Sequence, residues 1–424
     1  MNKQRSITAE LISIGDEVLT GHTVDSNASF IAQRLIEAGC ELKWRVTVGD
    51  DIAVIVSAIR TALTRADIVI TTGGLGPTHD DRTKDALCEL FDRKLVHHPE
   101  ILQELLRRYA ARNMTMPKSN ENQAMLPDGA RLFPNQFGSA VGICMEQTGK
   151  AVIALPGVPR EMMALMTESV VPYVRERFPS GEIVVHKIRT TGITESKLSD
   201  LLTPFVHVPE HISFAYLPSY GGVDLRFIAK GVNRESLQRE IASIDSTIRK
   251  HAGEFVFGTN DDTLESVVGG LLHSRHATLS VAESCTAGML GATIANVPGS
   301  SGYFMGGVIS YDNSVKEREL GVAPEILKSY GAVSSECAAA MATGVREKFN
   351  TTYALSITGI AGPDGETSEK PVGLVWFGLA TAEKTLTTQF RLSGDRQIIR
   401  TRATSIALDL LRRALLGLPT DHRL

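Results

Sequence analysis

The chain lacks the features that mark secreted, membrane-spanning and disulfide-stapled proteins. Its five cysteines are scattered over 424 residues and form no C-x-x-C pair, so we expect neither a disulfide framework nor a thiolate zinc site. The N-terminal segment reaches Asp16 before any long apolar run forms, and no later stretch is apolar enough to span a bilayer. These absences predict a cytoplasmic protein that has no membrane partner.

An excess of basic residues is also missing. The 44 lysines and arginines are balanced by 48 aspartates and glutamates, which argues against a surface built to neutralise a nucleic-acid backbone. Tandem repeats and low-complexity tracts are absent as well, so neither a solenoid nor a disordered chain is expected. With 43% hydrophobic residues in a chain of this length, we expect two or three domains with ordinary cores.

The first part of the chain alternates strand-like and helix-like runs. The pattern is βαβαβ over residues 8–14, 26–38, 42–48, 52–63 and 67–71. Such alternation predicts an α/β domain with a mostly parallel sheet and helices on both faces. A ligand would then bind beyond the carboxyl ends of the strands.

The pattern changes near residue 172, and two further domains are expected. The middle one is α+β, with strands over 183–191, 212–217 and 223–229, a helix over 234–251, and a polar linker over 258–262. The last one begins with a helix near Thr263 and a strand over 278–282, and it continues as α/β. The expected boundaries are therefore 1–172, 173–257 and 258–424.

A glycine-rich loop follows the third expected strand and carries the clearest binding signal of the first domain. Gly73, Gly74 and Gly76 let the backbone approach a ligand closely. Amide groups there, together with the next helix N-terminus, can hold phosphate oxygens; Thr78 belongs to the same run. Neither G-x-x-x-x-G-K-[ST] nor G-x-G-x-x-G is present, so the two standard nucleotide loops are excluded.

Four carboxylates flank this loop and the end of the first strand. Asp16, Glu17, Asp80 and Asp81 are predicted to hold a divalent metal ion that neutralises phosphate and activates water. The alternative is that Asp80 or Asp81 only caps the next helix. The turn over 156–161 either lines the same pocket or is a simple strand-to-helix connection.

The last domain contains serines and a lysine in three polar stretches that have no histidine. A serine amidase without histidine needs another base, and a desolvated lysine can serve. Ser301 with Lys316 is the preferred dyad, and Tyr311 is placed to relay a proton or to fix the serine hydroxyl. Ser284, which enters a helix from a loop, is either an oxyanion donor or the alternative nucleophile; spacing does not separate the two serines.

Further residues of this domain are candidates for substrate binding. Thr358 ends a strand in a glycine-rich turn and can bind a substrate oxygen, and Gly359 follows it. Arg396 presents a planar fork of donors that suits a phosphate, although isolated arginines often form only surface ion pairs. Cys285 has no histidine partner, so it is expected to be a packed residue and not a thiol nucleophile.

These stretches together resemble the CinA family. The similarity is carried by ISIGDEVLTGHTVDSN, TGGLGPTHDD, NENQAMLPDGA and LPGVPREM, and then by ESCTAG, VPGSS, YDNSVKE, GAVS, TGIAGPDG, EKPVG and GDR. The resemblance implies a molybdopterin-binding-like first domain, a KH-like middle domain and an amidase last domain. It also implies that Asn27, Thr78 and Gly157 lie at the first ligand, and that Thr286 contacts the second.

The resemblance further implies two activities of pyridine nucleotide salvage. The first domain would be a metal-dependent ADP-ribose pyrophosphatase. The last would convert nicotinamide mononucleotide and water to nicotinic acid mononucleotide and ammonia without a cofactor. A homodimer is implied as well. The alternative is that the first domain binds a nucleotide or a pterin without turnover, or that the whole protein is regulatory.

Two details depart from what the resemblance implies. KH modules that bind single-stranded nucleic acid clamp it through a GXXG loop, and the middle segment has none. Spacing and dimer contact are therefore its expected roles. In addition, Ala287 stands where the family usually has a second glycine, so the loop after Thr286 is less free to adopt a left-handed backbone.

Overall fold

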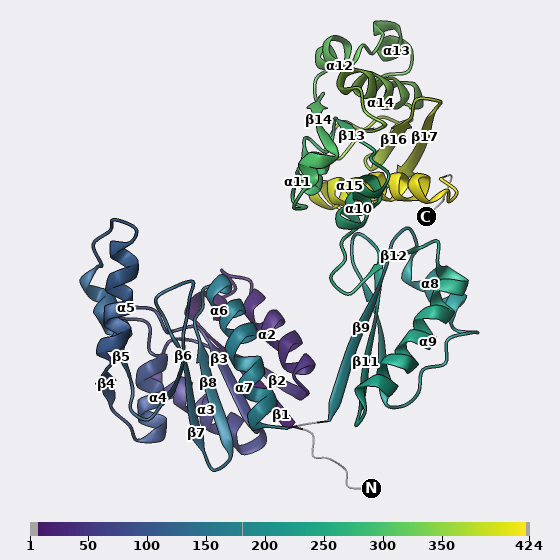
Figure 1. Ribbon diagram of the computed structural model, residues 1–424. Helices are drawn as coiled ribbons and strands as arrows, with labels where there is room; N and C mark the ends of the chain where they lie inside the picture. The colour runs from purple at the N-terminus through teal and green to yellow at the C-terminus, as the bar shows by residue number, and fades with distance from the viewer. Residues whose placement is uncertain (1–6, 180, 421–424) are drawn as a thin grey trace. The chain divides into compact units, whose positions relative to one another are not determined.

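The structure is a computed structural model that describes residues 7–179 and 181–420. Contacts divide the chain into two compact units, one formed by 1–184 with 230–237 and the other by 185–229 with 238–424. The strands form a six-stranded, a four-stranded, a five-stranded and a two-stranded sheet, and helices accompany the larger sheets (Figure 1). None of the helices in the described residues is both long enough and apolar enough to cross a membrane.

The first part of the chain alternates strands and helices, as expected. Its strands are β1 (Ile7–Ile14), β2 (Cys40–Val48), β3 (Ile68–Thr72), β4 (Leu95–His97), β5 (Met125–Pro127), β6 (Arg131–Phe133), β7 (Gly142–Gln147) and β8 (Lys150–Leu155). Its helices are α1 (Asp16–Leu19), α2 (Ser26–Glu37), α3 (Ile52–Arg65), α4 (Thr83–Phe91), α5 (Pro99–Ala110), η1 (Lys118–Ala124), α6 (Pro159–Leu165), η2 (Met166–Val170) and α7 (Val171–Arg177).

Six of these strands form the first sheet, in the order β2-β1-β3-β8-β7-β6. The first four strands run parallel, and β7 and β6 are antiparallel additions. One face is buried against α2, α6 and α7, and the other against α3 and α4. This is the expected three-layer α/β domain, and it brings the carboxyl ends of four parallel strands to one edge.

The middle part forms a four-stranded sheet in the order β10-β11-β9-β12. Its elements are β9 (Glu182–Thr190), α8 (Glu195–Leu202), β10 (Ile212–Pro218), β11 (Val223–Gly231), α9 (Arg234–Ala252) and β12 (Val256–Thr259). Alternate residues of β11 are buried, as the period of a half-buried strand requires. The predicted strands and helix of this part are confirmed.

The expected linker over 258–262 is wrong in its first half. Gly258 and Thr259 end strand β12 and pair with Arg189 and Ile188 of β9. Only 260–262 form the turn, in which Asp262 accepts a hydrogen bond from the Thr259 N–H. The glycine and polar composition resembled a linker because a four-residue edge strand has little hydrophobic periodicity.

The last part alternates helices and strands again. Its helices are α10 (Leu264–Ser274), α11 (Met289–Ala295), η3 (Ser300–Gly302), α12 (Asn313–Leu320), α13 (Pro324–Ser329), α14 (Ser335–Phe349) and α15 (Arg396–Leu416). Its strands are β13 (Leu279–Glu283), β14 (Phe304–Ile309), β15 (Tyr353–Gly359), β16 (Leu374–Ala380) and β17 (Thr385–Arg391).

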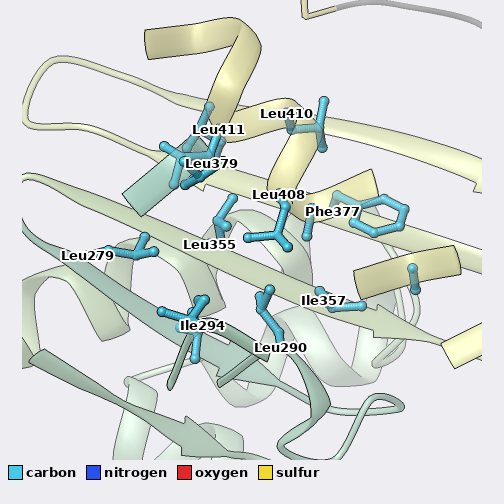
Figure 2. Packing of buried hydrophobic residues seen from close by; sticks show 14 of the residues in the cluster. Leu279, Leu290, Ile294, Leu355, Ile357, Phe377, Leu379, Leu408, Leu410 and Leu411 are labelled. Atoms are coloured by element: carbon cyan, nitrogen blue, oxygen red, sulfur yellow. The ribbon is translucent and has the colours of Figure 1, made fainter. Parts of the chain in front are cut away.

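The third sheet has the order β14-β13-β15-β16-β17 and is also covered on both faces. Helices α10, α11 and α15 bury one face, and α14 buries the other. Figure 2 shows the first of these cores, where Leu279, Leu355 and Phe377 of the sheet pack with Leu290 and Leu411 of the helices. Strands β14, β13 and β15 are parallel neighbours, so their carboxyl ends meet at one edge.

Candidate functional site

A cavity of about 400 Å³ opens at the carboxyl ends of the parallel strands of the first sheet. The glycine loop after β3 forms one wall, the turn after β1 forms another, and residues 156–159 form a third. A cavity of this volume suits a nucleotide-sized ligand. The sequence left two roles open for the turn over 156–161, and in the structure residues of this turn line the same cavity as the glycine loop.

The glycine loop is held in shape by its own backbone and by Asp81. Gly73 and Gly74 have φ angles of 110° and 64°, and a side chain at Gly73 would run into the Ile14 carbonyl. The Asp81 carboxylate accepts hydrogen bonds from the Gly76 N–H at 2.6 Å and from the Thr78 N–H and hydroxyl at 2.9 and 2.5 Å. Asp81 therefore braces the loop, while Gly73, Gly74 and Gly76 line the cavity.

Asn27 connects the walls of the cavity. Its Nδ2 donates to the Thr72 hydroxyl at 3.1 Å and to the Gly157 carbonyl at 2.8 Å. Its Oδ1 is buried and has no partner within the described residues. A buried acceptor without a partner costs free energy, so a ligand that donates a hydrogen bond to Asn27 would be favoured.

Acidic side chains concentrate beside the loop. Glu17, Asp50, Asp80 and Asp81 line the cavity, whereas the Asp16 carboxylate lies against Gly49. Burial raises the pKa of Asp50, and the charges of the neighbouring acids raise it further. In the described residues, no group of three or more histidine, cysteine or acidic side chains is arranged to hold a metal ion.

The sequence analysis missed Asp50 and did not single out Glu161. Asp50 follows β2, and its position at the shared edge could be inferred from the expected parallel order, which places the ends of neighbouring strands together. Glu161 lines the cavity from the first turn of α6, and burial raises its pKa although Asn135 donates a hydrogen bond to its carboxylate. Both acids hold protons more readily than exposed ones.

A second polar site lies at the carboxyl ends of β13, β14 and β15 in the third sheet. Glu283 pairs with Ile309 on one side and with Ile357 on the other. The next residues of the three strands, Ser284, Ser310 and Thr358, therefore lie side by side at this edge.

Glu283 fixes the loop that carries Ser284. Its buried carboxylate accepts hydrogen bonds from the Gly288, Leu290 and Gly291 N–H groups at 3.0, 3.0 and 2.8 Å. It thus binds the loop and the first turn of α11 to the strand end. Ala287 within this loop has a φ of 48°, so the left-handed backbone expected for the family's glycine is adopted by alanine.

Lys316 is buried at the same edge. Its side chain is 1% exposed, and its Nζ donates to the Ser310 carbonyl at 2.8 Å and to the Tyr311 carbonyl at 3.3 Å. No carboxylate forms an ion pair with it in the described part of the chain. Burial lowers the pKa of Lys316, and the charge of Asp312 opposes that shift in part. These surroundings favour the uncharged amine that a base requires.

The preferred pair of Ser301 and Lys316 does not form within one chain. Ser301 lies in η3 before β14 begins, while Lys316 contacts the residues that follow the strand. The six residues of β14 span five steps of about 3.3 Å, which separates these ends by roughly 17 Å. Spacing in sequence hid this separation, because a whole strand lies between the two residues. Two serines, Ser284 and Ser310, lie at the Lys316 edge. The Ser310 hydroxyl is buried and donates to the Glu283 carbonyl, which leaves Ser284 as the candidate nucleophile of the two.

Tyr311 and two arginines of α15 border this edge. Nη2 of Arg396 donates to the Tyr311 hydroxyl at 2.8 Å, and its Nη1 donates to the Gly362 carbonyl at 2.7 Å. Arg400, one helical turn later, donates to the Thr286 carbonyl at 2.7 Å. Its Nε and the Thr286 hydroxyl are buried without partners within the described residues. Sequence analysis missed Arg400, although the i, i+4 spacing from Arg396 could have indicated it.

The remaining candidates, Thr358, Gly359 and Cys285, have structural roles within the fold. The Thr358 hydroxyl is buried and donates to the Ala332 carbonyl at 2.7 Å, so its proton is not available to a substrate. A side chain at Gly359 would clash with the Leu374 carbonyl. Burial raises the pKa of Cys285 to about 12, which agrees with a packed residue and not with a thiolate nucleophile.

Comparisons with known proteins match three family models. The CinA C-terminal domain covers residues 261–415, the probable molybdopterin binding domain covers 10–176, and the KH domain of damage-inducible protein CinA covers 186–258. The expected fold of each part is thereby confirmed.

Relatives match over almost the whole chain. A CinA-like protein of Dictyoglomus turgidum is 42% identical over 96% of this chain and 99% of its own length. One of Gemmatimonas aurantiaca is 43% identical over 96% of both chains. The crystal structure of a CinA protein of unknown function from Thermoplasma acidophilum is 34% identical, with a TM-score of 0.37 over 39% of this chain and 98% of its own. The chain belongs to the CinA family.

Proposed function

We propose that the last domain is an amidohydrolase that releases ammonia from nicotinamide mononucleotide, with Ser284 as nucleophile and Lys316 as base. The observation that carries this proposal is the burial of Lys316 without an acidic partner. Its Nζ binds the carbonyl of Ser310, which is the neighbour of Ser284 in the sheet. A lysine kept uncharged beside a serine can take over the task of histidine in serine hydrolases.

The reaction follows from these positions. The uncharged Lys316 amine accepts the proton of the Ser284 hydroxyl as its oxygen attacks the carboxamide carbon. The Cys285 and Thr286 N–H groups follow Ser284 in the same loop, and they would stabilise the oxyanion. The Lys316 ammonium then gives this proton to the amide nitrogen, and the C–N bond breaks to release ammonia. Water, activated by the same amine, hydrolyses the resulting ester and frees the acid.

The two arginines of α15 supply the charge that a mononucleotide requires. Arg396 is exposed and always charged, and its partners are a carbonyl and a phenol. It therefore keeps its positive charge available for a phosphate. Arg400 retains a free Nε beside Thr286, close to the Ser284 loop. We propose that Arg396 binds the phosphate and that Tyr311 orients it.

Measuring ammonia release from nicotinamide mononucleotide tests this proposal. Ser284→Ala and Lys316→Met should each reduce kcat by about 10²–10⁴-fold with little change in circular dichroism. Arg396→Ala should mainly raise KM. Wild-type protein that releases no ammonia would contradict the proposal, and full activity in Ser284→Ala would exclude that residue as nucleophile.

For the first domain we propose a metal-dependent pyrophosphatase that splits ADP-ribose. The support is the cavity with glycine amides, the Asn27 acceptor and the concentrated acids. Burial raises the pKa of Asp50 and repulsion from neighbouring acids raises it further. A cation would relieve this repulsion, and carboxylate oxygens suit magnesium or manganese. Glu17, Asp50 and Asp80 would hold the ion together with phosphate oxygens. The ion would supply Lewis acidity and an activated water.

Binding without turnover is the second candidate for this domain, because no preformed metal-binding group is found among the described residues. Incubation with ADP-ribose and either magnesium or manganese separates the two. Release of AMP, lost with EDTA and in Asp50→Asn, supports the pyrophosphatase. Calorimetric binding of ADP-ribose with no AMP under either ion would leave a binding module.

A further inference from the structure

A further cavity, of about 190 Å³, lies within the second unit. One wall is a side of helix α15 between residues 402 and 413. The other consists of two loops of the middle part, residues 191–195 after β9 and the turn 218–222 between β10 and β11. None of the lining residues belongs to the site at the ends of β13, β14 and β15. The cavity is therefore a separate feature of this unit.

Hydrogen bonds hold the walls of this cavity in place. The Thr191 hydroxyl donates to the Gly221 carbonyl at 2.9 Å, which joins the two loops. Arg412 of α15 donates to the Glu254 carbonyl at 2.8 Å, and Arg413 donates to the Glu254 carboxylate at 2.7 Å. Glu254 precedes β12 of the middle part, so these bonds hold α15 against that part. The cavity thus lies between elements that are bound to one another.

The interior of the cavity is mostly apolar. The side chains that supply this surface are Ile193, Tyr220, Phe390, Ile406 and Leu410. Two of them are aromatic, and Tyr220 in the turn is 62% exposed. An apolar cavity of about 150 Å³ is large enough to bind benzene. This one therefore has room for a single six-membered ring with one small substituent.

Three of the four charged residues around the cavity are already compensated. Asp409 accepts a hydrogen bond from Arg412 at 2.7 Å, and Arg413 pairs with Glu254. Glu195 lies in the first turn of α8, where the positive end of the helix dipole stabilises a carboxylate. These three groups need no opposite charge from a ligand.

Arg402 is the fourth charged residue, and it forms no ion pair in the described part of the chain. Its Nη1 donates to the Ser393 carbonyl and hydroxyl at 3.2 and 3.1 Å, and both of these acceptors are uncharged. Because both bonds use the same nitrogen, the edge formed by Nε and Nη2 is left for an anion. A carboxylate matches that edge with two parallel hydrogen bonds.

We propose that this cavity binds a small aromatic monocarboxylate, with its ring among the apolar side chains and its carboxylate on Arg402. A carboxamide of the same shape would fill the space equally well but would leave the guanidinium without an opposite charge. The site therefore distinguishes an aromatic acid from its amide. The product and the substrate of the proposed deamidase differ in the same way, although the cavity itself does not rest on that activity.

Ligand-observed NMR of the full chain with benzoate and benzamide tests the recognition of charge. Benzoate should bind about tenfold more tightly than benzamide, because the amide cannot form the charge-assisted pair. Arg402→Gln should reduce the affinity for benzoate to that for benzamide. Arg391→Gln, at an exposed arginine of β17 outside the cavity, is the matched control and should bind benzoate as the wild type does. Failure of the wild type to bind benzoate, equal binding of the two ligands, or the same loss in both arginine variants would overturn the proposal.

Filling the cavity tests where the ring binds. The φ angle of Gly221 lies outside the left-handed region, and a Cβ there would meet the Ser405 Oγ at 3.5 Å, an ordinary contact. Gly221→Leu should therefore keep its circular dichroism and lose binding of both ligands. Gly270→Leu, on α10 where a Cβ meets nothing within 4 Å, should leave binding intact. Benzoate binding that survives in Gly221→Leu would show that the ring binds elsewhere.

A competition experiment separates this site from the two proposed active sites. Saturating nicotinamide mononucleotide and ADP-ribose should leave benzoate binding to the wild type unchanged, because neither proposed site shares a residue with the cavity. Displacement of benzoate by either nucleotide would place it at an active site and overturn the inference. The measurement needs no turnover, so its outcome is independent of whether the protein releases ammonia.

Discussion

At the scale of single residues, the proposed role of Lys316 as a base requires that its amine be uncharged. Burial lowers its pKa, and the negative charge of Asp312 raises it. The rate should therefore rise with pH as the amine loses its proton, at a pH below the ordinary range of lysine. Lys316→Arg should be inactive at every pH, because a guanidinium keeps its proton.

Asp312→Asn should move the rise of the rate with pH to lower pH. The substitution removes the charge that favours protonated Lys316, and asparagine remains a good N-cap for α12. The measurement is kcat/KM for ammonia release between pH 5 and 10 in wild type and variant. If the rise in kcat/KM stays at the same pH, or moves to higher pH, then Lys316 is not the group whose deprotonation controls the rate.

Ala287 stores backbone strain in the Ser284 loop. Its φ of 48° costs alanine about 1 kcal/mol relative to glycine. Ala287→Gly should therefore raise the free energy of unfolding by about that amount, measured by chemical denaturation. Ala292→Gly, at an exposed position inside α11, is the control and should instead lower it by about 0.5–1 kcal/mol. Destabilisation by both glycines would refute the strain.

At the scale of elements, the loop between β3 and α4 depends on Asp81. Its carboxylate receives three hydrogen bonds from that loop. Asp81→Ala should weaken binding of ADP-ribose about tenfold, a loss of about 1.4 kcal/mol, both with EDTA and with a divalent ion. Calorimetric titration under the two conditions measures this. A loss confined to the metal-containing buffer would make Asp81 a metal ligand instead.

ADP-ribose binding to Asp80→Asn, measured with EDTA and with a divalent ion, should contrast with binding to Asp81→Ala. Asp80 is exposed and lines the cavity, so its loss should matter only when an ion is present. The two neighbouring acids, which the sequence treats alike, thus have different expected roles because only one carboxylate turns back into the loop.

At the scale of the whole molecule, helix α15 ties the middle part to the last domain within the second unit. The buried Arg412 donates to Asp409 at 2.7 Å and to the Glu254 carbonyl at 2.8 Å. Arg412→Ala would leave Asp409 buried without this partner, which costs about 3–5 kcal/mol. Calorimetry should show a lower unfolding temperature for the second unit and no change for the first.

The double variant Arg412→Met with Asp409→Leu should recover much of that loss, because it removes the uncompensated charge together with its partner. If the double variant is as unstable as Arg412→Ala, the arginine acts mainly through its bonds to the middle part. Either way, the ammonia-release assay reports whether the junction matters for the proposed activity.

Much of the fold was predictable from local pattern. The hydrophobic periodicity and composition of the sequence indicate buried strands such as β3 and amphipathic helices such as α9. N-cap residues such as Asp395 directly precede the helix that they cap, here α15. Short elements were less predictable. The last two residues of β12, Gly258 and Thr259, were assigned to a linker because a four-residue strand shows no hydrophobic period, and only the pairing with β9 reveals it.

By itself the sequence determined the two α/β parts with an α+β part between them, the glycine loop and the two sets of polar residues, because these depend on residue type and short-range spacing. Tertiary structure alone decided which of them meet. It placed Ser284 beside the Lys316 edge and Ser301 a strand length away, turned Asp81 into a brace, and added Asp50 and Arg400. The physical reason is that neighbours at a sheet edge are chosen by strand order and direction, which connect residues far apart in the chain.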